Sequence, residues 1–387
     1  MNLKLWRIAF AALLTATLAG VGAVAVSASD SGRAPSVPRS CNGLAYGHMG
    51  PITGANAVLG QEQLKWSQLA LENFNREKGT RFRLIEGDDQ LNASQGATVA
   101  QRLASDRSVL GVVGPAGSQV VIAAGEIFAR ESLAMVSMSA TDAALSDGKY
   151  PTFFRVNANN NSQAPVVTKL IQTTLRAKKV FIVDDQTPDK KELADRVQRA
   201  LTRANVTVER ETVNRESIDF SSLVSKVDRD ADVVFLSWQT AASGQQFGQQ
   251  MREQGKRNTL VGANGLYSPS QFTIEGAYVA SFAPDIRSIE TGGAKRLADT
   301  YQQRNGNFGT FGPPSYVAAQ VVLDAMYQVC RKGNRPTREQ VLAQVRKTNL
   351  KTSILGTPVQ FAKNGNSRRA VFFLFKVEDG KYVPVKI

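Results

Sequence analysis

Hydroxyl-bearing residues follow two short apolar runs of this chain, at points where a small polar ligand could be held by hydrogen bonds. The run at 109–114 leads through a glycine turn to Ser118, and the run at 134–138 leads to Ser139 and Thr141. One helix start needs only one such residue, and helix capping by Ser139 or Thr141 is the simplest interpretation. Neutral hydroxyls and strand-end amides can also hold a charged group without burying a full countercharge.

Residue types that catalyse reactions are sparse. His48 is the single histidine, there is no C-x-x-C motif, and GVVGPAG matches neither the dinucleotide-binding pattern nor the P-loop pattern. The carboxylate pairs Asp88–Asp89 and Asp184–Asp185 could form a metal or acid/base pair, but solvated turns at strand ends explain them more simply. We therefore predict no enzymatic activity, no cofactor and no metal site.

The composition is that of a globular protein with a basic surface. The 387 residues are 42% hydrophobic and 21% charged, and the formal net charge is +14. This length suggests two or three domains. Lys and Arg are scattered, without a basic run interleaved with aromatic residues, so we expect a solvated basic surface and no specific nucleic-acid partner.

The N-terminus has the pattern of an export signal. Basic residues precede an apolar run at 8–26, which ends in the small residues VSA. We expect residues 1–28 to be a signal peptide, residues 29–41 to be a flexible linker, and the protein to act outside the cytoplasm. Because the apolar run approaches the length of a membrane span, an uncleaved N-terminal anchor is the alternative.

The chain has two cysteines, Cys41 and Cys330. In an exported chain this low, even count favours one disulfide between distant segments. The loop closed by such a bond is so long that chain entropy alone gives an upper estimate of about 5 kcal/mol of stabilisation. Two unpaired thiols are the alternative.

Short apolar runs alternate with amphipathic stretches along the chain. Helices are expected at 64–79, 118–132, 192–204 and 244–254, and strands at 109–114, 134–138, 178–185, 207–213, 232–238 and 259–263. Buried strands alternating with helices predict an α/β fold with parallel sheets covered on both faces. Two such series imply two lobes, with crossings at 150–165 and 275–285, and ligands of open α/β sheets bind beyond the carboxyl ends of the strands.

Five segments keep the order and spacing of a known family, and the spacing from Gly114 to Thr141 has no gap. The segments are 46–75, 109–147, 178–198 (KKVFIVDDQTPDKKELADRVQ), 218–238 and 262–269 (GANGLYSP). Together they resemble bacterial leucine/isoleucine/valine-binding proteins, the solute receptors of ABC importers. The resemblance covers about residues 42–387 and implies the type I periplasmic-binding-protein fold, with two Rossmann-like lobes joined by a three-segment hinge. The expected lobes are 42–157 with 283–356, and 158–282 with 357–387.

The resemblance implies roles for the hydroxyl clusters. Ser118 matches the family serine that holds the ligand carboxylate. In the family, the segment after the next strand supplies a backbone carbonyl for the ligand ammonium and a threonine whose amide and hydroxyl serve both ends. Ser139 and Thr141 fall on those positions, and Ala140 between them is also expected in the site. We expect ligand contact rather than helix capping, because two such clusters occur at matching strand ends.

Other positions match apolar contacts of the family less uniquely. Leu59 and Phe311 match side-chain contacts, although either could be ordinary packing. Gln239 or Thr240 stands where the family has an aromatic contact. The neighbouring Trp238 either takes over that contact or packs under the sheet.

Departures from the family pattern affect the expected ligand. Asn264 stands where the family usually has an acidic residue paired with the ligand ammonium, and Asp189–Lys190 stand where a Tyr-Gly is common. Asp189 could supply a replacement carboxylate. A branched-chain or other small amino acid is therefore the expected ligand, and an amide, urea-like or other small polar solute is the alternative.

These observations predict a monomeric, exported, two-lobed solute-binding protein that delivers a small molecule to an ABC permease. The same ectodomain could instead sense a ligand for a membrane signalling partner, and an uncleaved N-terminal anchor would favour that reading.

Overall fold

The computed structural model describes residues 37–291 and 293–386. The predicted signal peptide or anchor at 1–28, and the first residues of the predicted linker at 29–41, lie outside these ranges. No helix within them is both long enough and apolar enough to cross a membrane. The chain from Val37 onward forms one compact unit.

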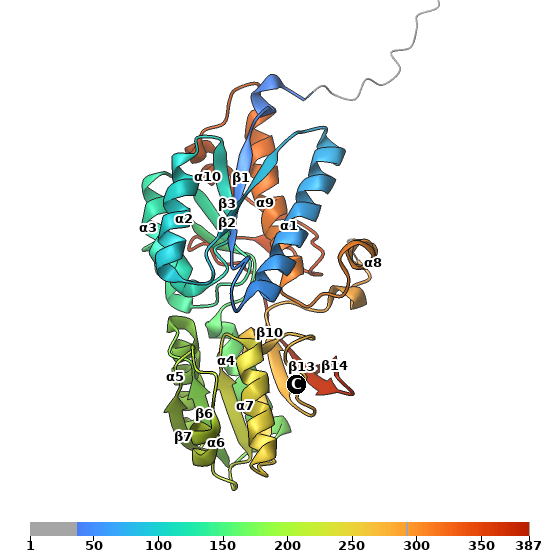
Figure 1. Ribbon diagram of the computed structural model, residues 1–387. Coiled ribbons are helices and arrows are strands. Elements are labelled where there is room, and N and C mark those ends of the chain that lie inside the picture. Colours follow the sequence, from blue (N-terminus) through green and yellow to red (C-terminus); the bar gives the residue numbers. More distant parts are fainter. Residues whose placement is uncertain (1–36, 292, 387) are drawn as a thin grey trace, which may run out of the picture. The chain divides into compact units, whose positions relative to one another are not determined.

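Five parallel strands form the sheet of the first lobe, in the order β2-β1-β3-β4-β5. They are Ala45–Gly50 (β1), Arg83–Asp88 (β2), Val109–Val113 (β3), Ala134–Ser137 (β4) and Phe153–Arg155 (β5). The helices of this lobe are Ala57–Lys78 (α1), Ala93–Ser105 (α2), Ser118–Arg130 (α3), Ala294–Asn305 (α8), Gly312–Cys330 (α9) and Arg338–Val345 (α10). Helix α2 packs on α3 at one face, and α1 packs on α9 at the other (Figure 1).

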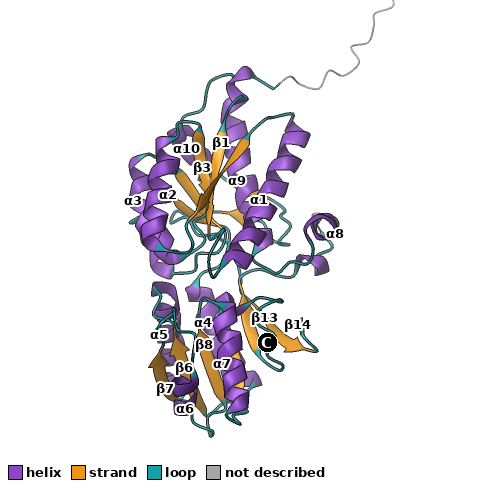
Figure 2. Ribbon diagram, viewed as in Figure 1, coloured by secondary structure: helices purple, strands orange, loops and turns teal. Residues whose placement is uncertain are grey.

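Seven strands form the sheet of the second lobe, in the order β14-β13-β10-β9-β8-β6-β7. They are Lys179–Asp184 (β6), Thr207–Thr212 (β7), Val233–Ser237 (β8), Thr259–Gly262 (β9), Tyr278–Ser281 (β10), Phe373–Glu378 (β13) and Lys381–Val385 (β14). The helices are Asn160–Lys169 (α4), Pro188–Arg203 (α5), Ser221–Lys226 (α6) and Ala241–Glu253 (α7). Strands β6 to β10 pair in parallel, and β13 and β14 extend the sheet in antiparallel pairing (Figure 2).

The predicted α/β fold with parallel sheets is confirmed, and the six predicted strands correspond to β3, β4 and β6 to β9. The central strands β3, β4 and β8 are buried along their whole length, as expected for strands covered on both faces. Helix α1 begins at Ala57, earlier than predicted. Its first turn contains Gly60, and glycine is a poor helix former, so the sequence pattern there did not indicate a helix. A Cβ atom at Gly60 would lie 2.0 Å from the carbonyl oxygen of Pro51, so this close approach excludes better helix formers.

The chain passes between the two sheets in three places: between β5 and α4, between β10 and α8, and between the short strand Val359–Gln360 (β12) and β13. Strand β12 pairs with Asn349–Leu350 (β11) outside both main sheets. The described residues of the predicted linker include a short 3-10 helix, Arg39–Cys41.

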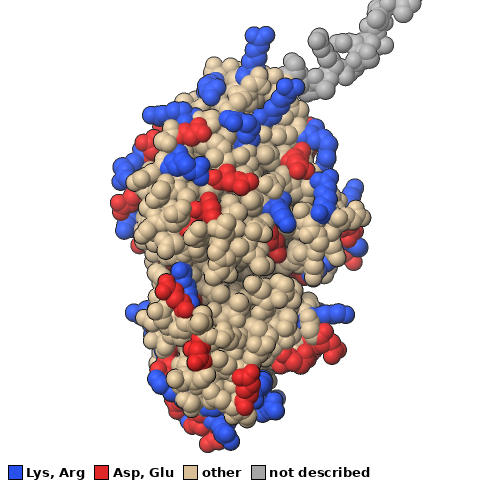
Figure 3. All heavy atoms as spheres, viewed as in Figure 1, with Lys and Arg blue, Asp and Glu red and all other residues tan. Residues whose placement is uncertain are grey.

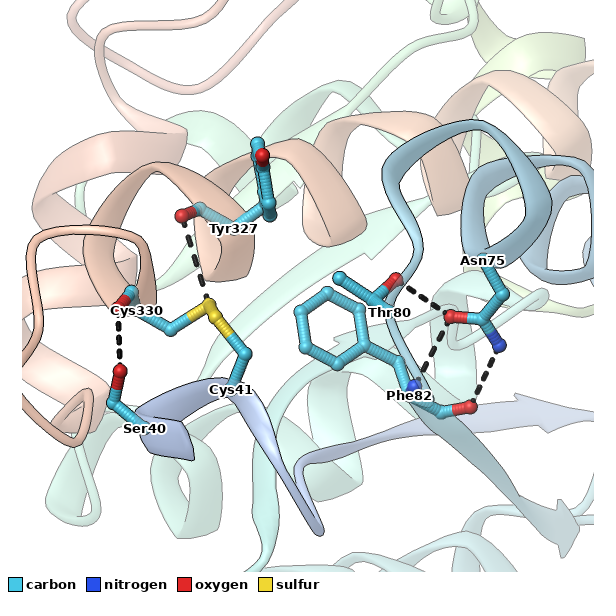
Figure 4. The surroundings of a disulfide bond; sticks show 7 residues. All are labelled: Ser40, Cys41, Asn75, Thr80, Phe82, Tyr327 and Cys330. Atoms are coloured by element: carbon cyan, nitrogen blue, oxygen red, sulfur yellow. Dashed lines mark hydrogen bonds between the residues drawn. A yellow bond between two sulfur atoms is a disulfide. The ribbon is translucent and has the colours of Figure 1, made fainter. Parts of the chain in front are cut away.

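Cys41 and Cys330 are joined by a disulfide that ties this short helix to the end of α9 (Figure 4). The hydroxyl of Ser40 donates a hydrogen bond of 2.7 Å to the carbonyl oxygen of Cys330. Both cysteines are fully buried. The bond therefore fixes the start of the described chain against the core of the first lobe.

Replacing both cysteines by serine is expected to lower the free energy of unfolding by as much as about 5 kcal/mol, because the disulfide closes a loop with a sequence separation of 289 residues. Urea unfolding of the double variant and of the oxidised wild type measures this difference. Thiol titration of the denatured, unreduced wild type should detect no free thiol, and two free thiols per chain would contradict the assignment.

Candidate functional site

The carboxyl ends of β3 and β4 in the first lobe face those of β6, β8 and β9 in the second, and a small pocket lies between them. Its volume is about 30 Å³. It is lined by Leu59, Leu91, Ala116, Gly117, Ser118, Ser139, Asp189, Lys190, Gln239, Asn264, Gly265 and Phe311. Seven of these are sequence-predicted site residues: Leu59, Ser118, Ser139, Asp189, Gln239, Asn264 and Phe311.

Ser118 begins helix α3 and braces the loop that follows β4. Its Oγ accepts hydrogen bonds from the backbone amides of Thr141 (3.2 Å) and Asp142 (3.1 Å). The turn before it requires glycine, because Gly114 has φ +111° and a Cβ there would lie 2.2 Å from the carbonyl oxygen of Met49. No described side chain caps α3, so its first amides and the Ser118 hydroxyl proton are left to donate to a ligand.

Ser139 and Ala140 are held by protein groups. The hydroxyl of Ser139 donates to the carbonyl oxygen of Ala116 (2.9 Å) and accepts from Gln63 (3.0 Å). The carbonyl oxygen of Ala140 accepts from Arg155 Nη1 (3.1 Å) and Asn157 Nδ2 (3.0 Å). Both lone pairs of the Ala140 carbonyl are thereby used, and we assign Ala140 to support of the loop.

A buried chain of polar groups crosses between the lobes. Thr141 Oγ1 donates to Asp189 Oδ2 (3.1 Å), Lys190 Nζ lies 2.8 Å from the same oxygen, and Lys190 Nζ also donates to Asn264 Oδ1 (2.9 Å). The side chains of Asp189 and Lys190 are 3% and 1% exposed. Asp189 Oδ1 has no hydrogen-bond partner among the described residues.

Thr141 therefore contacts the opposite lobe, and the cap of the 3-10 turn that follows is Asp142, so Thr141 and Ser139 are not helix caps there.

Lys190 is the charged lining residue that sequence reasoning did not assign to the site. It stands in the first turn of α5, where the helix dipole disfavours a cation. That unfavourable position was the available signal, and it shows that Lys190 needs specific partners.

Leu59, Phe311 and Gln239 connect the small pocket to a wider one of about 280 Å³ at the same interlobe boundary. Glu62 positions Phe311, because its carboxylate accepts the amides of Gly309 (2.9 Å) and Gly312 (2.7 Å). Burial raises the pKa of Glu62 above its ordinary value. The aromatic rings of Tyr267, Tyr301 and Phe308 also line the wider pocket.

Trp238 is placed differently from its predicted ligand-contact alternative. It is 2% exposed, and its ring packs against Phe220 and Phe247 in the core of the second lobe. It does not line the small pocket. Thr240 lies next to α7 as its N-cap residue and likewise stands outside that lining. Of this group, Gln239 alone faces the pocket.

The fold and this interlobe pocket define a solute-binding protein of the type I periplasmic class. The sequence model described as "Periplasmic binding protein" matches residues 46–381, so the chain belongs to that family. As its description says, it is a family of periplasmic binding proteins, for which extracytoplasmic location is typical.

Curated relatives span almost the whole chain. A Leu/Ile/Val-binding protein homolog 1 from Brucella abortus is 26% identical over 344 residues, covering 86% of this chain and 90% of the relative. An amino acid binding protein from Pseudomonas aeruginosa is 26% identical over 351 residues, covering 88% and 91%.

Solved structures share the fold. A leucine binding protein from Thermotoga maritima has a TM-score of 0.80 at 20% identity, covering 89% of this chain and 98% of that protein. A solute binding protein from R. palustris in complex with 4-hydroxybenzoate has a TM-score of 0.77 at 18% identity, covering 89% and 96%. One fold thus accommodates different ligands, and the ligand must be argued from the pocket.

Ser118→Ala should lower the free energy of unfolding by about 1–3 kcal/mol, because it leaves two buried backbone amides without their acceptor. Urea unfolding measures the change. Ser94→Ala, at an exposed position of α2, is the matched control and should change stability little. Equal stability of the two variants would show that Ser118 does not brace the loop.

Asp89 should make stability fall with rising pH. Burial raises the pKa of Asp89 to about 7, and its Oδ1 accepts the amide of Leu91, which lines the pocket. Between about pH 4 and about pH 7 the folded chain keeps a proton that the unfolded chain has lost, so the free energy of unfolding decreases through this window. Asp89→Asn should flatten that decrease and be more stable than wild type at pH 8.

Urea unfolding across this pH range tests the Asp89 prediction. Asp299→Asn, the same chemical change at an exposed site, should keep the wild-type slope. An unaltered slope in Asp89→Asn would contradict the assignment.

Proposed function

We propose that this protein is the extracytoplasmic solute-binding component of an ABC importer, holding a small carboxylate-bearing molecule between its lobes and presenting it to a membrane permease. The observation that carries the proposal is the pocket to which both lobes contribute polar groups from the carboxyl ends of their strands. Residues 1–28 are proposed to direct export, and the protein is proposed to act as a monomer. The names of the relatives make branched-chain amino acids the first ligands to examine.

The donors in the pocket favour a carboxylate. The hydroxyl of Ser118 and the first backbone amides of α3 offer hydrogen-bond donors, which carry partial positive charge, to a ligand in the pocket. The dipole of α3 adds to their attraction for an anion. Leu59 and Phe311 offer apolar contact on the side that leads to the wider pocket. A ligand with an acidic end and an apolar end fits this distribution.

Entry of such a ligand requires the lobes to separate. A space of about 30 Å³ holds a few water molecules and is too small for a molecule the size of an amino acid. Gln119 Nε2 donates to Gln239 Oε1 across the boundary (3.1 Å), and Arg215 Nη1 donates to the carbonyl oxygen of Leu91 (3.3 Å). These contacts must break when the lobes open and form again when they close, as in hinge-bending binding proteins.

The face shown in Figure 3 agrees with a solute-binding role more than with a nucleic-acid role. On the face shown in Figure 3, Lys and Arg side chains lie among Asp and Glu side chains. Such interspersed charge does not form the basic stripe that nucleic-acid binding needs.

A covalent link across the boundary should abolish ligand binding. Gln119→Cys with Gln239→Cys, joined by a short bismaleimide, holds together two side chains that are within hydrogen-bond distance. We expect the linked protein to show no heat on titration with ligands from a panel of amino acids and organic acids, and the unlinked double variant to bind.

The unlinked double variant is the matched control, because it carries the same substitutions. Undiminished binding after complete crosslinking would contradict a ligand site between the lobes. Mass spectrometry of the recovered ligand should find it chemically unchanged, since the family binds solutes.

A further inference from the structure

We infer that Lys190 supplies, from the protein itself, the ammonium group that an amino acid would bring, so that the pocket takes organic acids that lack an α-ammonium group. This inference rests on the proposed function and names the chemical class of its ligand. It concerns a residue of the second lobe whose charge is buried at the boundary with the first.

The position of Lys190 carries the inference. Its side chain is 1% exposed, and Nζ lies 2.8 Å from Asp189 Oδ2 and 2.9 Å from Asn264 Oδ1. A lysine ammonium has three N–H donors, so one is left after these two contacts. Since Lys190 lines the pocket, that donor is available to a ligand acceptor such as a carboxylate.

The charges around the pocket disfavour a second ammonium group. Among its described lining residues, Asp189 and Lys190 are the only charged ones. Asp189 Oδ2 already receives Lys190 and Thr141, and Asn264 Oδ1 already receives Lys190. A ligand ammonium would therefore share one carboxylate with a buried lysine, and like charges repel strongly where water is excluded.

The remaining acceptor suits a neutral donor. Asp189 Oδ1 is buried and has no partner among the described residues. A ligand hydroxyl can donate to it without bringing a second positive charge. The carboxylate of the same ligand then faces the Ser118 hydroxyl, the first amides of α3 and the free Lys190 donor. An organic acid with an apolar tail, and with a hydroxyl group near its carboxylate, is the best match.

Matched sets of ligands test this inference by calorimetric titration. Each set holds an α-amino acid, its 2-hydroxy acid and its unsubstituted acid, for example leucine, 2-hydroxy-4-methylpentanoate and 4-methylpentanoate, with a second set built on phenylalanine. We expect the wild type to bind the hydroxy acid of at least one set about tenfold or more tighter than the amino acid, as one favourable charged hydrogen bond allows.

Lys190→Met should reverse this preference. The change removes the buried ammonium and leaves the Asp189 carboxylate free for a ligand ammonium, so affinity for the acid should fall about tenfold and affinity for the amino acid should rise. The ratio of the two affinities is the readout, because a merely structural role would weaken both ligands alike. Lys191→Met, at an exposed neighbouring position, is the matched control and should keep the wild-type ratio.

A second variant covers the case in which Lys190→Met does not fold. Asp189→Asn with Lys190→Met removes both charges together, so no unpaired buried charge remains, and it should lose affinity for the acid without gaining affinity for the amino acid.

Tighter or equal binding of the amino acids by the wild type would overturn this inference and leave the proposed function intact. An unchanged affinity ratio in Lys190→Met would overturn it in the same way. Absence of binding across both sets and across the wider panel would contradict the proposed function as well.

Discussion

Two parallel sheets that present the carboxyl ends of their strands to each other determine where the polar groups of this protein lie. At that edge each strand passes into a loop or a helix N-terminus, so backbone amides and short polar side chains gather there. Ser118 follows β3, Thr141 follows β4, Asp189 follows β6 and Asn264 follows β9. The location of the site is thus a consequence of strand direction. The kind of ligand that it binds is determined by the few side chains at those strand ends.

The buried ion pair of Asp189 and Lys190 is costly as a stabilising device. Transferring two charges from water to the protein interior costs most of the free energy that their mutual attraction provides. Replacing one partner alone typically destabilises a protein by about 3–5 kcal/mol. Apolar residues at both positions would hold the lobe together at least as well. The pair is better explained by what it offers a ligand, because it places one donor and one acceptor beside a pocket that is otherwise lined by neutral groups. Thr141 extends the pair to the first lobe, which makes the charge arrangement depend on how the lobes meet.

The sequence allowed most of the fold to be predicted, together with most polar lining residues of the site, including the charged Asp189. Apolar runs marked the buried strands, because central parallel strands are covered on both faces, and the hydroxyl clusters marked the ends of β3 and β4. The edge strands β2 and β7 are only partly buried, and only β7 was predicted.

The role of Lys190 was harder to predict. Lysine is almost always solvated, and the one local signal, a place near the start of α5, is shared by the exposed Lys191. The burial of Lys190 depends on distant partners such as Asn264, 74 residues away. Trp238 and Gln239 are neighbours, yet one enters the core and the other faces the pocket. Adjacent positions at a strand end point in different directions, and a pattern of residue types does not say which position faces the ligand.

Arg155 connects the polar loop of the site to the segments that join the lobes. It is fully buried at the end of β5, where the chain leaves the first sheet. Its guanidinium donates to the carbonyl oxygens of Ala140 and Asp142 and to the Asn366 side chain, which belongs to the third crossing segment. Burial lowers the pKa of Arg155 to about 10, which still leaves it positively charged at neutral pH.

One cation therefore holds together the loop that carries Thr141 and two of the three connections between the sheets. A movement of the lobes that bends these connections must either carry the loop with it or break hydrogen bonds to a buried charge, and the second course is the more expensive. Because Ser118 holds the same loop through the amides of Thr141 and Asp142, the loop is fixed to the first lobe from both sides. Opening of the lobes is then most easily accommodated by breaking the contacts of Thr141 with Asp189 and of Gln119 with Gln239. A ligand can enter the pocket only when these contacts are broken.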